Sequence, residues 1–281
     1  MAVLEFRDAS AGDVVRVEAW DAASLVGHAS ARPVQLFEHE RFCDVQVDHG
    51  RRREGIGFAL WAALDRAVPP SETLVCRVLH ADADAVAFVG SIGHDLVEHC
   101  PAPQADPTSQ AWAAWCAAQA VPDGSVAVGS DEVPEADLEE AWVDYYVWAH
   151  ETVGPLRPRA VVAAASAGLG ADLDHGVSTL VLRGGRVVAI ALVFSEPPWD
   201  GIVRVLAETP RVDEPDGVHL VAAALARTLT LLADRGVRRV ELEGRTFDPH
   251  LPAVVATFPP HDSNPMSVVR LHRSGSDTMA G

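Results

Sequence analysis

The sequence predicts an α/β (α+β) protein made of two tandem copies of one unit. An alternating strand-like segment, residues 42–48, runs through a basic, glycine-rich turn into a helical pattern, and a similar succession recurs about 160 residues later. The chain has 281 residues, 48% of them apolar and 22% charged, which are values of a folded globular protein. This length allows two domains of ordinary size.

The repeat has a nearly constant spacing. Residues 24–29 match residues 186–191, and Gly55 matches Gly217, in both cases 162 positions later. The strand-like residues 74–79 match residues 239–244 at a similar spacing. A fixed period over several elements indicates a duplicated structural unit.

The first strand interrupts this spacing. Residues 3–7 match residues 125–129, only 122 positions later, so the first copy lacks about forty residues after its first strand. In the second copy, apolar and aromatic residues at three–four spacing predict a helix over residues 135–152, and residues 159–168 are a second candidate. We therefore expect two helices in the second copy that the first copy lacks.

The pattern divides the chain into four parts. A first domain is predicted over residues 1–105 and a second over residues 124–273. Between them, residues 106–123 are expected to be a proline-rich linker with a short helix over residues 111–120. Residues 274–281 contain no core-forming side chains and are expected to be a mobile tail.

The basic turn is the feature most informative about function. Arg51, Arg52 and Arg53 precede Gly55 in a chain of formal net charge −18, with a strand before them and a helix after them. Glycines let a backbone approach a phosphate, free N–H groups at a helix start bind anions, and Arg adds forked donors. This arrangement predicts a pyrophosphate site, and the alternative is a strand–turn–helix joint with exposed arginines.

These residues resemble a known family. The motif resembles the V-x-P-x-x-R/Q-x-x-G-x-G/A signature of the GCN5-related N-acetyltransferase (GNAT) superfamily, in the form Val47-x-His49-x-x-Arg52-x-x-Gly55-x-Gly57. Further along, Asp82, Ala85, Phe88 and then Gly93 resemble the family's N-x-x-A…G-F segment. The resemblance covers roughly residues 1–105. It implies a mixed, mostly antiparallel central sheet flanked by helices in each of two tandem GNAT-type domains.

The resemblance also implies a function and a cosubstrate. It implies an acyl-CoA-dependent N-acyltransferase, with acetyl-CoA or another acyl-CoA as cosubstrate and acetyl as the expected group. The backbone of Val45 and Val47 would hold the pantetheine and thioester. The pyrophosphate would be held by the turn Arg52, Arg53, Glu54, Gly55, Ile56 and Gly57. The cofactor-binding set is completed by Asp82 and Phe88.

The proton route departs from the family pattern. Where many members place a Tyr as general acid, this chain has Val89, and Asp82 and His49 replace the usual Asn and Pro. Glu40 is the candidate general base, next to the position that often carries a catalytic Glu; a solvated charge at a strand end is the alternative. Some members use water chains, so a missing Tyr leaves catalysis possible.

The second copy departs from the motif at the turn. Residues 213–217 carry three carboxylates where the first copy has arginines. A pyrophosphate there would meet repulsion of about 1 kcal/mol per close charge pair even with the screening of water. We expect a degenerate second domain that is structural or that contributes walls to the acceptor site.

Composition argues against some classes of binding partner. The acidic balance argues against nucleic acid, and runs such as residues 187–194 are too short to span a membrane. The scattered cysteines indicate reduced thiols in the cytoplasm, and no motif predicts a metal. We expect a small-molecule amine as acceptor and make no prediction of the oligomeric state. The competing interpretation is a non-catalytic acyl-CoA-binding or scaffold protein of the same fold.

Overall fold

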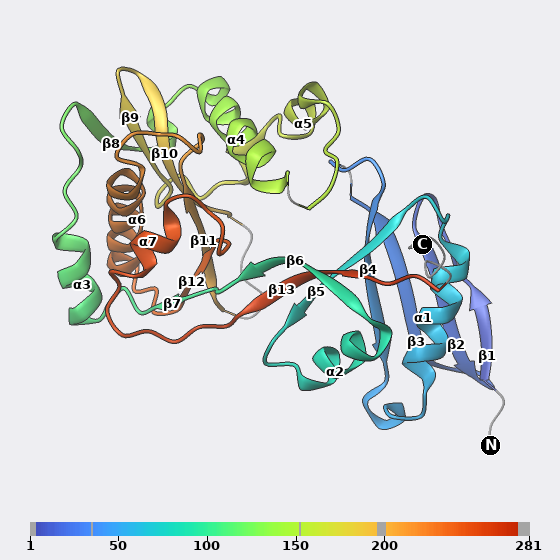
Figure 1. Cartoon of the computed structure of the whole chain (residues 1–281). Helices are drawn as coiled ribbons and strands as arrows, with labels where there is room; N and C mark the ends of the chain where they lie inside the picture. The colour runs from blue at the N-terminus through green and yellow to red at the C-terminus, as the bar shows by residue number, and fades with distance from the viewer. Residues whose placement is uncertain (1–3, 35, 152, 196–200, 275–281) are drawn as a thin grey trace, which may run out of the picture. The chain divides into compact units, whose positions relative to one another are not determined.

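The computed structural model describes residues 4–34, 36–151, 153–195 and 201–274 (Figure 1). The chain divides into two compact units. Unit 1 comprises Met1–Val97, Val153–Pro155 and Ser267–Gly281, and unit 2 comprises Glu98–Thr152 and Leu156–Met266. Of the predicted tail, residues 275–281 lie outside the described residues.

Unit 1 is built on a seven-stranded sheet of order β1-β2-β3-β4-β5-β13-β6. Strands β1 to β4 pair antiparallel, whereas β4 and β5 pair in parallel. Its elements are β1 (Leu4–Asp8), β2 (Val15–Asp21), β3 (Ser24–Pro33), β4 (Glu40–Val47), η1 (His49–Arg51), α1 (Ile56–Ala67), β5 (Thr73–Leu79), α2 (Ala83–Ile92), β6 (His94–Cys100) and β13 (Met266–Leu271).

The core of unit 1 lies between α1 and one face of this sheet. Ile56, Leu60 and Leu64 follow one another at the four-residue spacing of a helix face and are fully buried. They pack in one cluster with Ala19 of β2 and Ala29 of β3. The alternation of small apolar and polar residues along β2 and β3 therefore gives a sheet with one covered face.

Unit 2 is built on a six-stranded sheet of order β7-β12-β11-β10-β9-β8. Strands β11 and β12 pair in parallel, and the other neighbouring strands of this sheet pair antiparallel. Its elements are β7 (Gln104–Ala105), α3 (Gln110–Ala117), β8 (Ser125–Gly129), η2 (Ser130–Glu132), α4 (Glu135–His150), α5 (Arg159–Ala165), η3 (Leu169–Asp172), β9 (Thr179–Arg183), β10 (Arg186–Val193), β11 (Val203–Glu208), α6 (Gly217–Asp234), β12 (Val240–Glu243) and α7 (Leu251–Val255).

Both faces of the unit 2 sheet are covered. Ala189 and Ala191 of β10 belong to the cluster that packs against α6, and Ile190 and Leu192 belong to the cluster that packs against α4. Figure 1 shows α6 and α4 on opposite sides of the strands. A strand buried on both faces needs a continuous apolar run, and β10 has one.

The two units differ after their first strand. In unit 2, α4 and α5 lie between the first two strands, β8 and β9, whereas β1 leads to β2 in unit 1 without a helix. The strand predicted over residues 3–7 is Leu4–Asp8, and residue 3 lies outside the described residues. The extra helices account for the second covered face of unit 2.

The structure divides the chain differently from the sequence prediction. The predicted linker helix is α3, and its Trp112 and Trp115 are buried in the core of unit 2. Strand β7 lies inside the predicted first domain but joins the sheet of unit 2. Strand β13 lies inside the predicted second domain but joins the sheet of unit 1. The reason is that hydrogen bonding along a sheet edge selects a strand's partner, and alternation in the sequence carries no such information.

Helix α6 is long and apolar enough to cross a membrane by length and composition, and no other helix in the described part of the chain is. Most of its 18 residues are buried inside the structure. A core helix of a folded domain has the same composition, and α6 packs on the sheet of unit 2 in that way.

Candidate functional site

The central strands of unit 1 separate to form a cleft. β4 and β5 pair from Glu40 with Thr73 to Phe42 with Val75, and both strands continue beyond this last pair. A cavity of about 640 Å³ opens there. It is lined by residues 43–47 of β4, by residues 51–53 and 55–58 at the start of α1, by residues 76–79 of β5, by parts of α2 with Asp82, and by Leu271.

The corresponding strands of unit 2 stay paired for longer. Arg204 of β11 and Glu241 of β12 correspond to Phe42 and Val75, at spacings of 162 and 166 residues, because the next residue on each strand faces α1 in unit 1 and α6 in unit 2. In unit 2 the pairing continues for two more residue pairs, to Leu206 with Glu243. These two pairs are open in unit 1, so the cleft begins where unit 2 is still hydrogen-bonded.

The turn before α1 provides backbone donors. Gly55 is the N-cap of α1 with φ 80°, and Arg53 also has a positive φ of 67°. No side chain caps the helix, and the first N–H groups of an α-helix have no partner within it. Because Ile56 and Gly57 line the cavity, this helix start can bind an anion from its solvent side.

The three arginines are paired with carboxylates in this structure. Arg51 contacts Asp21 at 2.8 Å and Glu54 at 3.0 Å. Arg52 lies 3.4 Å from Asp84, and Arg53 pairs with the same carboxylate. One acid thus neutralises two exposed arginines, and an anionic ligand at the turn would compete with it. Both interpretations of the turn, a pyrophosphate site and a joint with exposed arginines, are compatible with this geometry.

The structure brings most of the predicted cofactor residues together. The residues that line the cavity are Val45, Val47, Arg52, Arg53, Gly55, Ile56, Gly57, Asp82 and Phe88. Glu54 is not in the lining and pairs with Arg51 instead. The Asp82 carboxylate caps α2 by accepting the Ala85 N–H at 3.0 Å. Asp82 therefore positions the helix that carries Phe88.

Glu40 lies apart from the cavity. It begins β4, is only 4% exposed and does not line the cleft. Its carboxylate lies 3.4 Å from Nη2 of Arg270, which also donates to the carbonyl of Val153 at 2.6 Å. The alternative of a solvated strand-end charge does not describe Glu40, which is buried and pairs with the partly exposed Arg270.

The sequence interpretation did not assign two thiols and a carboxylate of the cleft to the site. Cys43 and Cys76 are 7% and 9% exposed and both line the cavity. The neighbouring Cys76 thiol raises the pKa of the Cys43 thiol, with burial adding to the effect, and the Cys43 thiol lowers the pKa of Cys76. Asp44 also lines the cavity and accepts a hydrogen bond from Gln46 at 2.8 Å. The parallel register of β4 and β5 was the missing signal.

Comparisons with known proteins match this architecture. A tandem GNAT protein from the clavulanic acid biosynthesis pathway, solved without AcCoA, superposes with a TM-score of 0.65 at 17% identity, over 93% of this chain and 84% of that chain. A GCN5-related N-acetyltransferase from Sphaerobacter thermophilus superposes with a TM-score of 0.62 at 16% identity, over 94% and 82%. The chain has the GNAT fold. An acetyltransferase of the same family from Colwellia psychrerythraea gives 0.58 at 9% identity, over 93% and 86%.

Comparisons at the level of sequence gave no match. No family model matches the chain, and no curated protein matches it. Identities below one fifth show the GNAT fold alone.

The second GNAT unit has an occupied turn before α6. Glu214 is buried and lies 2.8 Å from Arg186, and Asp216 lies 3.2 Å from Arg183. Asp216, with φ 59°, is the N-cap of α6, so it and not Gly217 corresponds to Gly55. A Cβ on Gly217 would lie 2.2 Å from Nε2 of His250. Side chains thus fill the space in front of this helix.

Unit 2 contains further buried polar groups. Arg245 donates to Glu98 at 2.8 Å and to the Tyr145 hydroxyl at 3.1 Å. Burial raises the pKa of Asp248 to about 6, and its Oδ1 has no hydrogen-bond partner within the described residues. Tyr145 also packs on Trp142 and Trp148, so this aromatic cluster is largely core.

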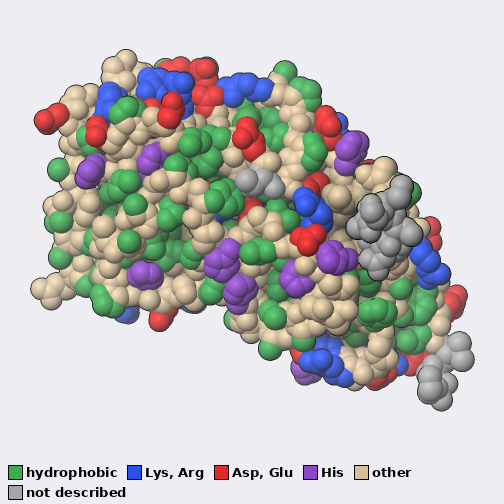
Figure 2. Space-filling model, viewed as in Figure 1, with side chains coloured by type: hydrophobic (Ala, Val, Ile, Leu, Met, Phe, Trp, Pro, Cys, Tyr) green, Lys and Arg blue, Asp and Glu red, His purple; other side chains and the backbone are tan. Residues whose placement is uncertain are grey.

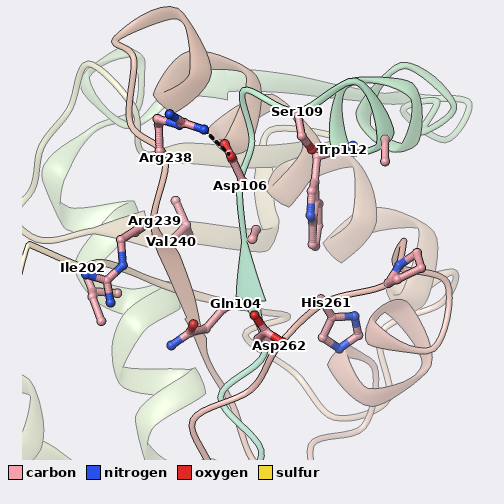
Figure 3. A pocket seen from close by; sticks show the side chains of 13 residues that line it. Gln104, Asp106, Ser109, Trp112, Ile202, Arg238, Arg239, Val240, His261 and Asp262 are labelled. Carbon is pink, nitrogen blue, oxygen red and sulfur yellow. Dashed lines mark hydrogen bonds and ion pairs between the residues drawn. The ribbon is translucent and has the colours of Figure 1, made fainter.

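Unit 2 has a separate cavity of about 370 Å³ (Figure 3). It is bounded by β7, the start of α3, the start of β12 and residues 260–262. Arg238 and Asp106 form an ion pair of 3.5 Å at its edge, and Trp112 forms part of the wall. None of the predicted site residues lies there.

Charges of both signs are mixed over the surface. On the face in Figure 2, arginine side chains lie beside acidic ones, in keeping with ion pairs such as Arg159 with Asp144 at 2.7 Å. Across the described ranges, no three His, Cys, Asp or Glu side chains form a group that would hold a metal ion.

Proposed function

We propose that unit 1 binds acyl-CoA in the cleft between β4 and β5 and transfers the acyl group, expected to be acetyl, to the amine of a small molecule in the cytoplasm. The single observation that carries this proposal is the cleft itself. It joins two separated parallel strands to a basic helix start with unused N–H groups. Unit 2 has paired strands and carboxylates at the same place.

Each part of the cleft matches one part of acyl-CoA. The backbone of Val45 and Val47 lies beyond the last pair with β5, so its polar groups on that side are available to pantetheine. The first turn of α1, with Arg52 and Arg53, would take the pyrophosphate in place of Asp84. The thioester would then lie near the root of the cleft.

The reaction needs alignment and a route for one proton. The amine nitrogen attacks the thioester carbonyl, the C–S bond breaks, CoA leaves as the thiol, and the nitrogen loses a proton. Holding the two reactants together supplies much of the rate. For the proton, Asp44 is the carboxylate of β4 that lines the cleft, and ordered water is the other route.

A second candidate function, acyl-CoA binding without turnover, is favoured by the missing acid. Val89 is buried at the position where the family pattern has Tyr. The chain's two tyrosines, Tyr145 and Tyr146, both lie on α4 of unit 2. Glu40 is held by Arg270 away from the cavity lining.

One pair of measurements separates these functions. Calorimetry with acetyl-CoA tests binding, and thiol release from acetyl-CoA across a panel of small amines tests transfer. Binding with amine-dependent thiol release supports the acyltransferase. Binding without release for any amine supports the non-catalytic function. Absence of binding would overturn both.

A further inference from the structure

Two thiols meet at the root of the cleft. Phe42 and Val75 are the last paired residues of β4 and β5, and the next residue on each strand is a cysteine. Cys43 and Cys76 belong to the same buried cluster under α1, so both side chains point to the same face of the sheet. The Cys43 thiol donates to the carbonyl of Val75, the residue before Cys76, at 3.4 Å.

Their spacing suits a covalent bond. Neighbouring strands lie about 4.8 Å apart, and a disulfide joins Cα atoms about 4.4–6.8 Å apart. Residues directly after a paired position on parallel strands fall within this range before the strands have separated far. Oxidation would therefore need little movement of the backbone.

The cavity makes the pair accessible to small molecules. Both cysteines line it, although each is less than a tenth exposed. The other two cysteines lie on different elements: Cys100 ends β6 and Cys116 lies on α3 of unit 2. All four are reduced in this structure.

The equivalent position in unit 2 shows the closed arrangement of these strands. Cys43 and Cys76, which face α1, correspond to Val205 and Leu242, which face α6 and lie opposite one another in register. The pairing of β11 and β12 continues through this position to Leu206 with Glu243. Apolar side chains at this position thus accompany closed strands, and two separate thiols accompany open ones.

We propose that Cys43 and Cys76 form a reversible disulfide that closes the root of the cleft in unit 1. With a peroxide as oxidant, the Cys76 thiolate attacks one oxygen to give a sulfenic acid and water. The Cys43 thiol then displaces the second oxygen as water and the S–S bond forms. Two thiols are oxidised and one peroxide is reduced to two waters. A dithiol reductant reverses the reaction by thiol–disulfide exchange.

The disulfide occupies space that the thioester of a bound acyl-CoA needs. It places two bonded sulfurs between the strands at the point where they separate, and it ties β4 to β5. The effect on acyl-CoA rests on the proposed function, whereas the disulfide does not. Because coupling is reciprocal, bound acyl-CoA must hinder oxidation by the same factor by which oxidation weakens acyl-CoA binding.

The first experiment tests the bond without any ligand. The variant C100S/C116S, which keeps only the pair, is treated with hydrogen peroxide, and its intact mass and the linked peptides are measured. We expect loss of two hydrogens, a Cys43–Cys76 peptide, and recovery with dithiothreitol. The matched variants C100S/C116S/C43S and C100S/C116S/C76S should show neither change. Persistence of two free thiols, or oxygen addition without a linked peptide, would overturn the proposal.

The second experiment tests the closure. Desulfo-CoA, which has no thiol to exchange, is titrated into reduced and oxidised C100S/C116S. We expect at least tenfold weaker binding to the oxidised form. Saturating desulfo-CoA favours the reduced form, so it should make the midpoint potential of the pair less negative by about 30 mV per tenfold difference in affinity. Equal affinities would overturn the closure. No binding by either form would overturn the proposed function, while the mass measurement still decides the disulfide.

Discussion

The Glu214 carboxylate lies 2.8 Å from the guanidinium of Arg186 and occupies the turn before α6 from inside unit 2. In unit 1 the equivalent turn has its arginines outside, held by the single carboxylate of Asp84. The same fold element therefore presents a buried, paired carboxylate in one copy and exchangeable surface pairs in the other. Surface pairs of this kind contribute little to stability, so a ligand can replace them.

We first expect one acyl-CoA to bind per chain. Unit 1 has an open cleft and unused N–H groups, whereas unit 2 has paired strands and a side-chain-filled turn. Calorimetry with acetyl-CoA should give a stoichiometry near one. Two sites of equal affinity would contradict this interpretation of unit 2.

The second prediction concerns the basic turn. Replacing Arg52 and Arg53 together by Glu should weaken acetyl-CoA binding by well over tenfold, because two attractions to the pyrophosphate become repulsions. The melting temperature should change by only a few degrees, since both side chains are exposed. Affinity is measured by calorimetry and folding by thermal denaturation.

Two controls sharpen this measurement. The double variant R7E/R66E makes the same change of charge on exposed side chains that do not line the cavity and should bind acetyl-CoA normally. Asp84→Asn removes the competing carboxylate and should strengthen binding severalfold. Unchanged affinity in R52E/R53E would show that the pyrophosphate lies elsewhere.

The third prediction separates the two glycines. Gly55 has φ 80°, and a Cβ there would meet no other atom within 4 Å, so Val at this position strains the turn and projects into the space through which the ligand approaches. A Cβ on Gly217 would collide with the His250 ring, so Val there should lower the melting temperature. We expect Gly55→Val to lose acetyl-CoA affinity and folded Gly217→Val to keep it. Equal losses of affinity would contradict the assignment.

The fourth prediction concerns the proton. Because Glu40 is paired with Arg270 and does not line the cavity, Glu40→Gln should lower kcat less than about tenfold, whereas a positioned base contributes about 10²–10⁴-fold. Asp44→Asn on the same strand should cost more. A hundredfold loss in Glu40→Gln, with normal acetyl-CoA affinity and a shifted pH profile, would instead make Glu40 the catalytic base.

The fifth prediction is a pH dependence of stability. Burial raises the pKa of Asp248 to about 6 from an ordinary value near 4, so the folded state holds this proton more tightly than the unfolded state. Its contribution is complete below about pH 4 and is lost as the pH rises through 6, a change of about 3 kcal/mol at most.

Asp248→Asn tests this directly. The variant should be more stable than the wild type at pH 8, and the difference should vanish or reverse at pH 4, measured by urea denaturation. The Asn carbonyl can still accept the Arg245 N–H, which Asp248 accepts at 2.7 Å. A destabilised variant at pH 8 would show that the Asp248 charge is favourable in the folded state.

The sequence determined the repeating plan and the basic turn. Hydrophobic periodicity is local, so the helix that begins at Ile56, its counterpart after Asp216 and the two additional helices of unit 2 could be predicted from spacing. The glycine and the arginines before α1 could be predicted in the same way, because a turn's chemistry lies within a few consecutive residues. The fold class follows from these local patterns taken in order.

Only the tertiary structure decided which distant residues meet. The parallel register of β4 and β5 places Cys43 beside Cys76, 33 positions later, and a difference of two residue pairs opens unit 1 and closes unit 2. The sequence around Glu40 is that of an exposed charge at a strand end, but in the folded chain Glu40 pairs with Arg270 of β13. Pairing between distant segments also places β7 in the sheet of unit 2 and β13 in the sheet of unit 1. Strand partners are chosen by hydrogen bonding and packing between segments far apart in the chain, and local pattern carries no record of that choice.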